Sequence, residues 1–220
     1  MEMTTTTKGQ VVIPSSVRRK LGIKTGTRIR VEVDEENSQI ILKPITREYI
    51  HSLRGQFRGK GLLDELAAEK KKERILEHDG LFHKRMPKPK SVVLDSWAVM
   101  AFLEDEPAGA KVADLIADAH DEGLPLLITV ANVGEVWYIV ARRTSEKDAD
   151  KAIKLLTEIG VEFVDIDWTL TKIAAGYKVK RNISYADCYA ASLAKHQRAQ
   201  LITGDREFKQ VEKEVAIFWL

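Results

Sequence analysis

The sequence lacks most features that would place it outside ordinary globular proteins. Cys188 is its one cysteine, which excludes an intrachain disulfide and a cysteine-based zinc site and favours a reducing, cytoplasmic compartment. The N-terminal residues show no apolar signal-peptide core. The most apolar stretch, residues 124–141, is interrupted by Pro125 and Glu135. Because a bilayer span needs about 20 mostly apolar residues, we expect no membrane segment.

Charge is distributed unevenly along the 220 residues. The first 90 hold 20 of the 35 Lys and Arg residues but only 12 of the 33 Asp and Glu residues. A basic front half joined to an acidic back half favours an acidic partner, such as a nucleic acid, for the front. Two ordinary solvated surfaces would give the same asymmetry, so charge alone does not decide between these readings.

Residues 1–45 have the pattern of a small β-domain. Residues 10–13, 27–33 and 39–43 read as short strands, and residues 16–21 as a short helix that ends at Gly22. So small a unit buries little surface by itself, so we expect it to dimerise.

Residues 46–80 change in character. A short helix is expected at 46–53, a glycine-rich cationic stretch that is extended and mobile without a partner at 54–61, and a charged helix at 62–76. The apolar stripe of this helix is too thin for a core, so we expect it to dock on another surface. Residues 81–90 read as a linker.

Residues 91–220 alternate strands and helices. Strands are expected at 91–94, 126–129, 162–166, 200–203 and 215–218, with helices between them. This order predicts a three-layer α/β domain around a parallel sheet.

Four acidic residues of this domain converge on one place in the predicted fold. Asp95 and Asp205 directly follow apolar strands, and Glu135 and Asp187 lie in the first turns of helices. Ligands of open α/β sheets bind beyond the carboxyl ends of the strands, toward which all four can point. Asp95, Asp187 and Asp205 could each instead be a helix cap or a turn residue, and Glu135 could form a buried salt bridge.

Repulsion among four convergent carboxylates is relieved by a divalent cation. Oxygen ligands without Cys or His favour Mg²⁺ or Mn²⁺. Such a metal site suits hydrolysis of a phosphodiester.

The segments 92–98, 132–136, 184–191 and 201–208 resemble, in order and spacing, the four motifs of PIN domains of the VapC toxin family. The resemblance covers about 130 residues. It implies a metal-dependent endoribonuclease with Asp95, Glu135, Asp187 and Asp205 as its catalytic, metal-binding acids, RNA as substrate, and Ser96 and Thr203 as accessory hydroxyls. Trp97 departs from the small residue that is usual at its position.

Residues 7–14, 17–23 and 26–29 resemble the swapped-hairpin antitoxins of the AbrB/VapB family. That resemblance implies a barrel made by two interleaved chains, a homodimer or higher oligomer, and binding to operator DNA. Lys8, Gln10, Arg18 and Arg19 are the candidate DNA contacts, although each cation could equally be a solvated surface charge.

Residues 53–63 resemble the toxin-neutralising tail of VapB proteins. A guanidinium from this segment could lie among the four carboxylates, where the metal or an RNA phosphate would go. Arg54 and Arg58 are the candidates for that role, with Phe57 and Leu62 as apolar anchors. The alternative is a flexible basic linker that binds nothing.

The sequence therefore predicts an antitoxin and a toxin joined in one chain. The domains expected are 1–45 (DNA binding and dimerisation), 46–80 (neutralisation), 81–90 (linker) and 91–220 (nuclease). The predicted function is a ribonuclease held inactive by its own antitoxin segment. Two alternatives are a DNA-binding repressor with an inert nuclease half and an RNA-processing nuclease.

Overall fold

The N-terminal part of the chain forms a small hairpin unit. The computed structural model describes residues 3–73 and 90–220. In the first range a short helix precedes an antiparallel strand pair, which is followed by two further helices. These elements are α1 (Ser15–Lys20), β1 (Ile29–Asp34), β2 (Gln39–Pro44), α2 (Arg47–Leu53) and α3 (Leu62–Glu73).

One face of the β1–β2 hairpin is apolar. Val31 lies opposite Leu42, and Val33 lies opposite Ile40, so four aliphatic side chains meet on the same side. Val33 is 70% exposed and Ile40 is 72% exposed. A two-stranded hairpin with an uncovered apolar face is at best marginally stable in water.

The prediction of a strand at residues 10–13 differs from the structure, where this stretch lies outside any strand. The N-terminal sheet of the described residues has two strands and is not a closed barrel. Residues 10–13 would need a neighbouring strand to hydrogen-bond with in order to form a strand. One copy of this short segment supplies only β1 and β2, which pair with each other.

Residues 90–220 form the predicted α/β domain. Its five strands are all parallel, in the order β5-β4-β3-β6-β7. The elements are β3 (Val92–Leu94), α4 (Ser96–Glu104), α5 (Gly109–Asp121), β4 (Leu126–Thr129), α6 (Val130–Arg143), α7 (Glu146–Glu158), β5 (Val161–Val164), α8 (Trp168–Lys180), α9 (Tyr185–Gln197), β6 (Gln200–Thr203), the 3₁₀ helix η1 (Arg206–Gln210) and β7 (Ala216–Trp219).

The sheet is packed on both faces because its strands are apolar on both sides, as buried parallel strands are. Val92 and Leu94 belong to the core that includes α4, α5, α6 and α7. Val93 and Leu201 belong to the core formed with α8 and α9. Every expected strand and helix of this domain is present, with ends that agree to within two residues.

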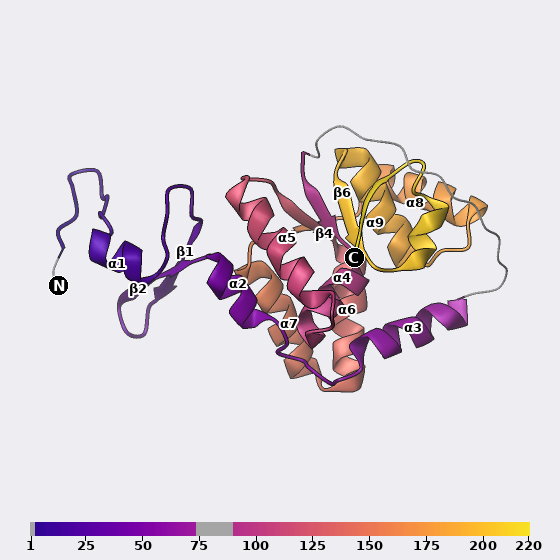
Figure 1. The fold of residues 1–220 in the computed structure, drawn as a ribbon, viewed down its shortest axis with the longest axis horizontal. Helices are drawn as coiled ribbons and strands as arrows, with labels where there is room; N and C mark the ends of the chain where they lie inside the picture. The colour runs from indigo at the N-terminus through magenta and orange to yellow at the C-terminus, as the bar shows by residue number, and fades with distance from the viewer. Residues whose placement is uncertain (1–2, 74–89) are drawn as a thin grey trace.

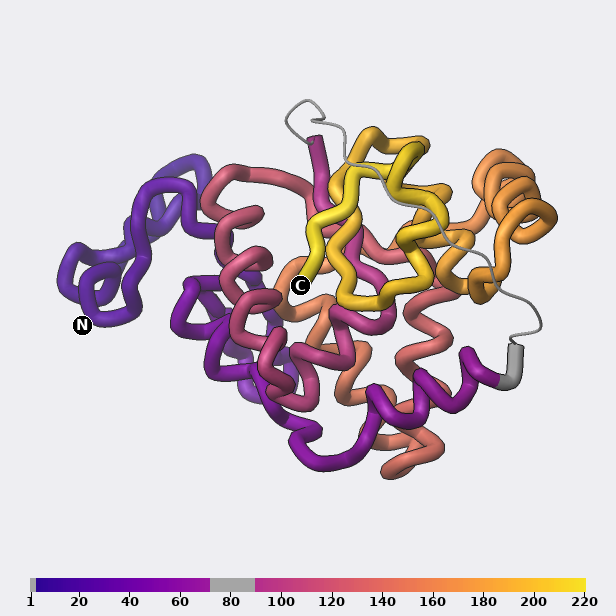
Figure 2. The backbone as a smooth tube through the Cα atoms, turned by 45° about the vertical axis from the view of Figure 1, so that its right-hand side comes forward, coloured from indigo at the N-terminus to yellow at the C-terminus, as the bar shows by residue number. Residues whose placement is uncertain are grey.

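The segment between the hairpin and the α/β domain packs against the first of these cores. Ile45, Ile50, Phe57, Leu62 and Leu66 are buried and form one cluster with the side chains of α4, α5 and α6. Figure 1 shows the hairpin unit projecting to the left, and α3 lying below α4 and α6. Figure 2 shows the same segment wrapped along one side of the domain. The segment thus contributes to the domain's hydrophobic core.

Part of the expected organisation lies outside the described residues. These are the end of the charged helix beyond residue 73 and residues 81–89 of the predicted linker. The stretch 54–61, expected to be extended, instead forms turns with Gly55, Gly59 and Gly61 at positive φ. In the part of the chain that the structure describes, no helix is long and apolar enough to cross a membrane.

Candidate active site

Asp95 and Asp205 lie side by side at the carboxyl edge of the sheet. Asp95 follows β3 and Asp205 follows β6, and these strands are neighbours in the sheet. The Asp95 carboxylate accepts hydrogen bonds from the Ala98 amide at 2.8 Å and from the Thr203 hydroxyl at 2.6 Å. Asp205 accepts one from the Glu207 amide at 2.8 Å. Both residues therefore cap a helix and also reach the site, so the two readings of the sequence are compatible.

Asp187 and Glu135 approach the same edge from helices. Asp187 lies in the first turn of α9, where the Ser184 hydroxyl accepts a hydrogen bond from the Asp187 amide at 3.1 Å. Glu135 lies in the second turn of α6, one turn later than expected, and is buried. All four carboxylates act electrostatically on one group, the Lys70 ammonium.

The accessory hydroxyls differ in their surroundings. Thr203 donates to Asp95 and accepts from the Asp205 amide at 2.9 Å, so it connects the two acids. Ser96 instead lies against Asn132, whose side-chain amide is 3.2 Å from the Ser96 hydroxyl. Asn132 also contacts Thr129 at 2.5 Å. Asn132 was not among the predicted site residues, and its buried polar contacts position the start of α6 beside α4.

Lys70 of α3 occupies the centre of the acidic cluster. Its ammonium nitrogen lies 2.8 Å from both carboxylate oxygens of Asp187 and 2.6 Å from Asp205 Oδ2. The Lys70 side chain is only 5% exposed. A buried ammonium is costly unless it is paired, so this placement depends on the carboxylates around it.

The electrostatics of the cluster reflect burial and this one cation. Burial alone would lower the pKa of Lys70, but Asp187, Asp205, Glu135 and Asp95 outweigh it and hold the pKa well above its usual value. Burial raises the pKa of Asp95 to about 8, against the opposing effect of Lys70. Burial also raises the pKa of Asp187. The carboxylates are therefore held at an electrostatic cost that a cation relieves.

The donor set suits a divalent metal ion, but its present spacing suits the ammonium. Carboxylate oxygens without His or Cys are the ligands that Mg²⁺ and Mn²⁺ prefer. Among residues 3–73 and 90–220, no three acidic, His or Cys side chains are placed to hold one metal ion together. Asp187 and Asp205 are both turned onto Lys70. Lys70 therefore supplies the positive charge at the point where these two carboxylates converge.

The prediction that Arg54 or Arg58 enters the acidic cluster differs from the structure. Both side chains reach Asp105, at the end of α4. Arg54 Nε lies 2.5 Å from Asp105 Oδ1, and Arg58 contacts the other oxygen. The turns at 54–61 dock on α4 through the bonds of the Gly55 and Phe57 amides to the carbonyls of Phe102 and Leu103, at 3.0 and 2.8 Å, which place both arginines at the end of that helix.

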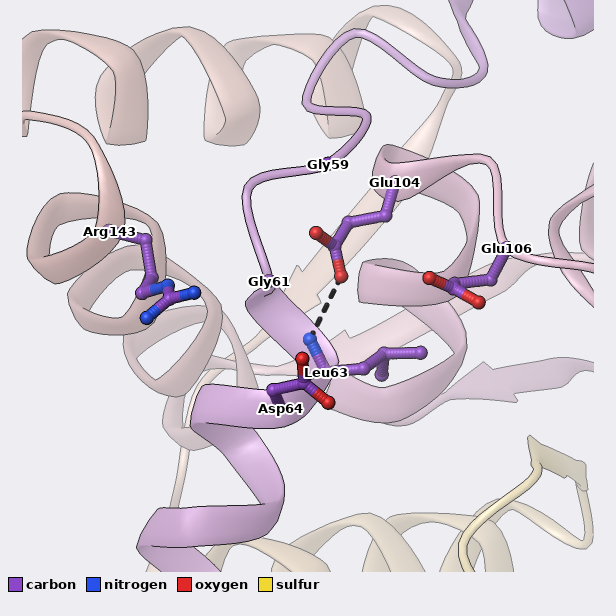
Figure 3. A pocket seen from close by; sticks show the side chains of 7 residues that line it. All are labelled: Gly59, Gly61, Leu63, Asp64, Glu104, Glu106 and Arg143. Atoms are coloured by element: carbon purple, nitrogen blue, oxygen red, sulfur yellow. Dashed lines mark hydrogen bonds between the residues drawn. The ribbon is translucent and has the colours of Figure 1, made fainter.

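Apolar anchors and a helix cap from the α/β domain hold α3 in place. Phe57 is 6% exposed and Leu62 is fully buried, as apolar anchors require. Glu104, at the end of α4, accepts a hydrogen bond from the Leu63 amide at 3.0 Å (Figure 3). A carboxylate there accepts a hydrogen bond from an otherwise unpaired amide in the first turn of α3. Its negative charge also interacts favourably with the positive N-terminal end of the helix dipole.

The predicted DNA contacts lie far from this site. Lys8, Gln10, Arg18 and Arg19 are all exposed in the hairpin unit. The Arg18 guanidinium donates to the Ile13 carbonyl at 3.1 Å, which holds α1 against the preceding turn.

Two family profiles match separate parts of the chain. The profile of the PIN domain family matches residues 92–214, more than half of the chain. A profile described as antidote-toxin recognition MazE, bacterial antitoxin, matches residues 3–49. Among curated proteins, none matches significantly.

Solved toxin–antitoxin structures resemble this chain at low sequence identity. VapBC2 from Rickettsia felis, bound to a fragment of promoter DNA, is 14% identical, with a TM-score of 0.49 over 58% of this chain and 96% of its own. VapBC-1 from nontypeable Haemophilus influenzae is 19% identical, with a TM-score of 0.47 over the same shares. The Mycobacterium tuberculosis toxin VapC20, which cleaves the sarcin-ricin loop, is 18% identical, with a TM-score of 0.43 over 55% of this chain and 95% of its own.

Proposed function

The chain belongs to the PIN domain family and carries an antitoxin-type domain ahead of that domain, and we propose that it is a metal-dependent endoribonuclease held inactive by its own antitoxin segment. The observation that carries this proposal is the position of Lys70, whose ammonium contacts Asp187 and Asp205 from within the segment between the two domains.

The four acidic residues are the proposed ligands of the metal ion. Asp95, Glu135, Asp187 and Asp205 would hold Mg²⁺ or Mn²⁺ once Lys70 has left. The bound metal would orient a water molecule, lower its pKa and neutralise charge on the RNA phosphate. Thr203 keeps Asp95 and the Asp205 backbone in register through its two hydrogen bonds. Lys70 supplies one of the positive charges that the metal would otherwise provide, and so competes with it.

The N-terminal unit has the features of a dimeric DNA-binding domain. The apolar face made by Val31, Val33, Ile40 and Leu42 is uncovered in one copy, and a second copy of the same hairpin has the shape and polarity to cover it. The exposed Lys8, Gln10, Arg18 and Arg19 would then contact operator DNA, with the cations on phosphates and Gln10 on bases. This arrangement would let the silent protein also repress its own promoter.

An RNA cleavage assay on the full chain tests the proposal. Lys70→Gln removes the cation and keeps most of the side-chain volume. Lys71→Gln is the matched control, because Lys71 is the next residue of α3 and is exposed. With Mg²⁺ or Mn²⁺ and a mixed pool of structured RNAs, we expect cleavage by the Lys70 variant and none by the unaltered chain or the Lys71 variant.

Asp95→Asn added to Lys70→Gln should abolish this cleavage. If the unaltered chain cleaves as fast as the Lys70 variant, self-inhibition is wrong and an RNA-processing nuclease becomes the better reading. If no variant cleaves RNA with either metal, the nuclease proposal fails and DNA-bound repression becomes the leading function.

A further inference from the structure

One face of α6 continues the active site beyond the acidic cluster. Glu135, Tyr138 and Arg142 are spaced three and four residues apart, so they lie along one side of the helix. Seven residues of helix place Arg142 about 10 Å from Glu135 along the helix axis. Helix α3 covers this face, with Lys70 at the acidic end and Glu65 and Glu69 at the basic end.

Arg142 holds two carboxylates of α3 at the same guanidinium nitrogen. Its Nη1 lies 2.7 Å from Glu69 Oε2 and 3.3 Å from Glu65 Oε1. The guanidinium also lies 4.9 Å from the centre of the Tyr138 ring, which fixes its orientation. Arg143 is used mainly to hold backbone, because its Nε donates to the Lys60 carbonyl at 2.7 Å, while its Nη1 lies 3.8 Å from Glu65 Oε2.

Helix α3 therefore presents to α6 the charges of a metal-bound RNA strand. Lys70 puts a positive charge where the four carboxylates would hold a cation. Glu65 and Glu69 put negative oxygens on Arg142, two turns further along the same face of α6. Exposed ion pairs contribute about 0–1 kcal/mol to stability. Arg142 is 48% exposed, so its pairing adds little to the attachment that Leu62 and Leu66 already provide.

We propose that Arg142 is a phosphate-binding subsite for the RNA strand on α6, and that Glu65 and Glu69 occupy this subsite in the silent chain. The inference rests on the proposed function, because it assumes that the acidic cluster acts on RNA. Arginine is suited to the role, since its planar guanidinium binds two oxygens of one anion. The inhibitory helix thus imitates both the metal and the substrate.

RNA binding by the full chain tests the subsite. The background is Glu65→Gln/Glu69→Gln/Lys70→Gln, in which α3 has lost its charged contacts with α6 and the acidic cluster. Binding of a 5′-fluorescein-labelled single-stranded RNA oligonucleotide is followed by anisotropy in EDTA, so that no metal-dependent cleavage occurs. In this background Arg142→Gln is compared with Arg181→Gln.

Arg181 is a matched control elsewhere on the same domain. Its guanidinium lies 5.1 Å from the Tyr177 ring and pairs with Glu214, so like Arg142 it combines a tyrosine ring with a carboxylate, although its Nε also donates to the Gln210 carbonyl at 2.7 Å. We expect Arg142→Gln to weaken RNA binding about tenfold, as for loss of a charged hydrogen bond. The slope of log K against log salt should fall by about 0.7, the value for one phosphate contact on a single strand. Arg181→Gln should change neither quantity beyond twofold.

Arg142→Lys serves as the conservative variant and should keep the salt slope, because it keeps the charge. The N-terminal domain is common to every variant, so RNA bound there does not affect the comparison. Equal effects of the two Arg→Gln changes would overturn the proposal. So would an opened background that binds RNA no better than the unaltered chain. If RNA binding depended on Arg142 but the Lys70 variant cleaved no RNA, the nuclease proposal would be refuted, while the phosphate-binding subsite would still be supported.

Discussion

The ammonium of Lys70 lies 2.6 Å from the carboxylate of Asp205, a residue 135 positions later in the chain. This contact joins the segment that follows the antitoxin-type domain to the centre of the PIN domain. It makes the charge balance of the acidic cluster depend on whether α3 is docked.

The unaltered chain and its Lys70→Gln variant should respond differently to divalent metal. Without Lys70 the carboxylates repel one another, so the variant should have a lower Tm than the unaltered chain in EDTA. Mn²⁺ or Mg²⁺ at about 100 times its Kd should then stabilise the variant by about 2.7 kcal/mol. Thermal melts of both proteins, with and without metal, measure this. A Tm of the unaltered chain that rises as much as that of the variant would show that Lys70 does not compete with metal.

Asp105 should matter more for docking of the antitoxin segment than either of its arginines. It is 10% exposed, and it receives both Arg54 and Arg58. Asp105→Asn keeps the left-handed backbone conformation, which Asn tolerates, and removes the charge. We expect a loss of about 1–3 kcal/mol in the free energy of unfolding, measured with urea. Asp118→Asn is the control: Asp118 pairs with Arg47 but is 58% exposed, so its loss should cost less than about 1 kcal/mol.

The apolar face of the hairpin should control the oligomeric state. Val33→Ser/Ile40→Ser makes a directly opposed pair polar without altering the strands' hydrogen bonds. Sedimentation should show a dimer, or a multiple of it, for the unaltered chain and a monomer for the variant. Val179→Ser is the control, because Val179 is 85% exposed on α8 and outside the hairpin. A monomeric unaltered chain would refute dimerisation through this face.

Stability should fall in mild acid because of His120. Burial lowers the pKa of this imidazole, although its hydrogen bond to the Ile159 carbonyl at 2.7 Å opposes the shift, and Arg28 and Asp121 act on it weakly. Below about pH 6.5 the unfolded chain takes up a proton that the folded chain does not. This contribution is therefore present above that pH and is lost as the pH falls through the folded-state pKa.

Because of this depressed pKa, the free energy of unfolding should be smaller at pH 5.5 than at pH 7.5. Urea denaturation at pH 7.5 and pH 5.5 measures it. His120→Gln retains a donor for the Ile159 carbonyl and should show a smaller difference between the two pH values. An unchanged difference would assign the acid sensitivity to other groups.

The sheet and the placement of the acids were predictable because they depend on local patterns. Apolar runs gave the parallel strands, and residues such as Asp95 and Asp205 that follow adjacent strands must meet at one edge. The comparisons confirm the two-part organisation of antitoxin-type and PIN domains. The roles of Asp95, Glu135, Asp187 and Asp205 stay predictions.

The sequence predicts that Arg54 or Arg58 enters the acidic cluster because it predicts an extended stretch at 54–61, and the structure differs on both points. Glycines at positive φ fold this stretch back onto α4, which takes Arg54 and Arg58 to Asp105. A signal for Lys70 was present: it lies four residues after Leu66 and eight after Leu62, in phase with the buried stripe of its helix. A cation in phase with the docking face is a better candidate than one in the adjoining turns.

The contribution of Leu62 and Leu66 to the core of the α/β domain has a consequence for how the protein is made. The ribosome synthesises this segment before any of the five parallel strands, and nascent domains generally fold from the N-terminal side first. The apolar surface of the newly made PIN domain therefore meets this segment while it folds. Under the proposed function, a cell translating this single message would therefore make a nuclease that is inhibited as soon as it folds, with no interval in which a separate inhibitor must find it.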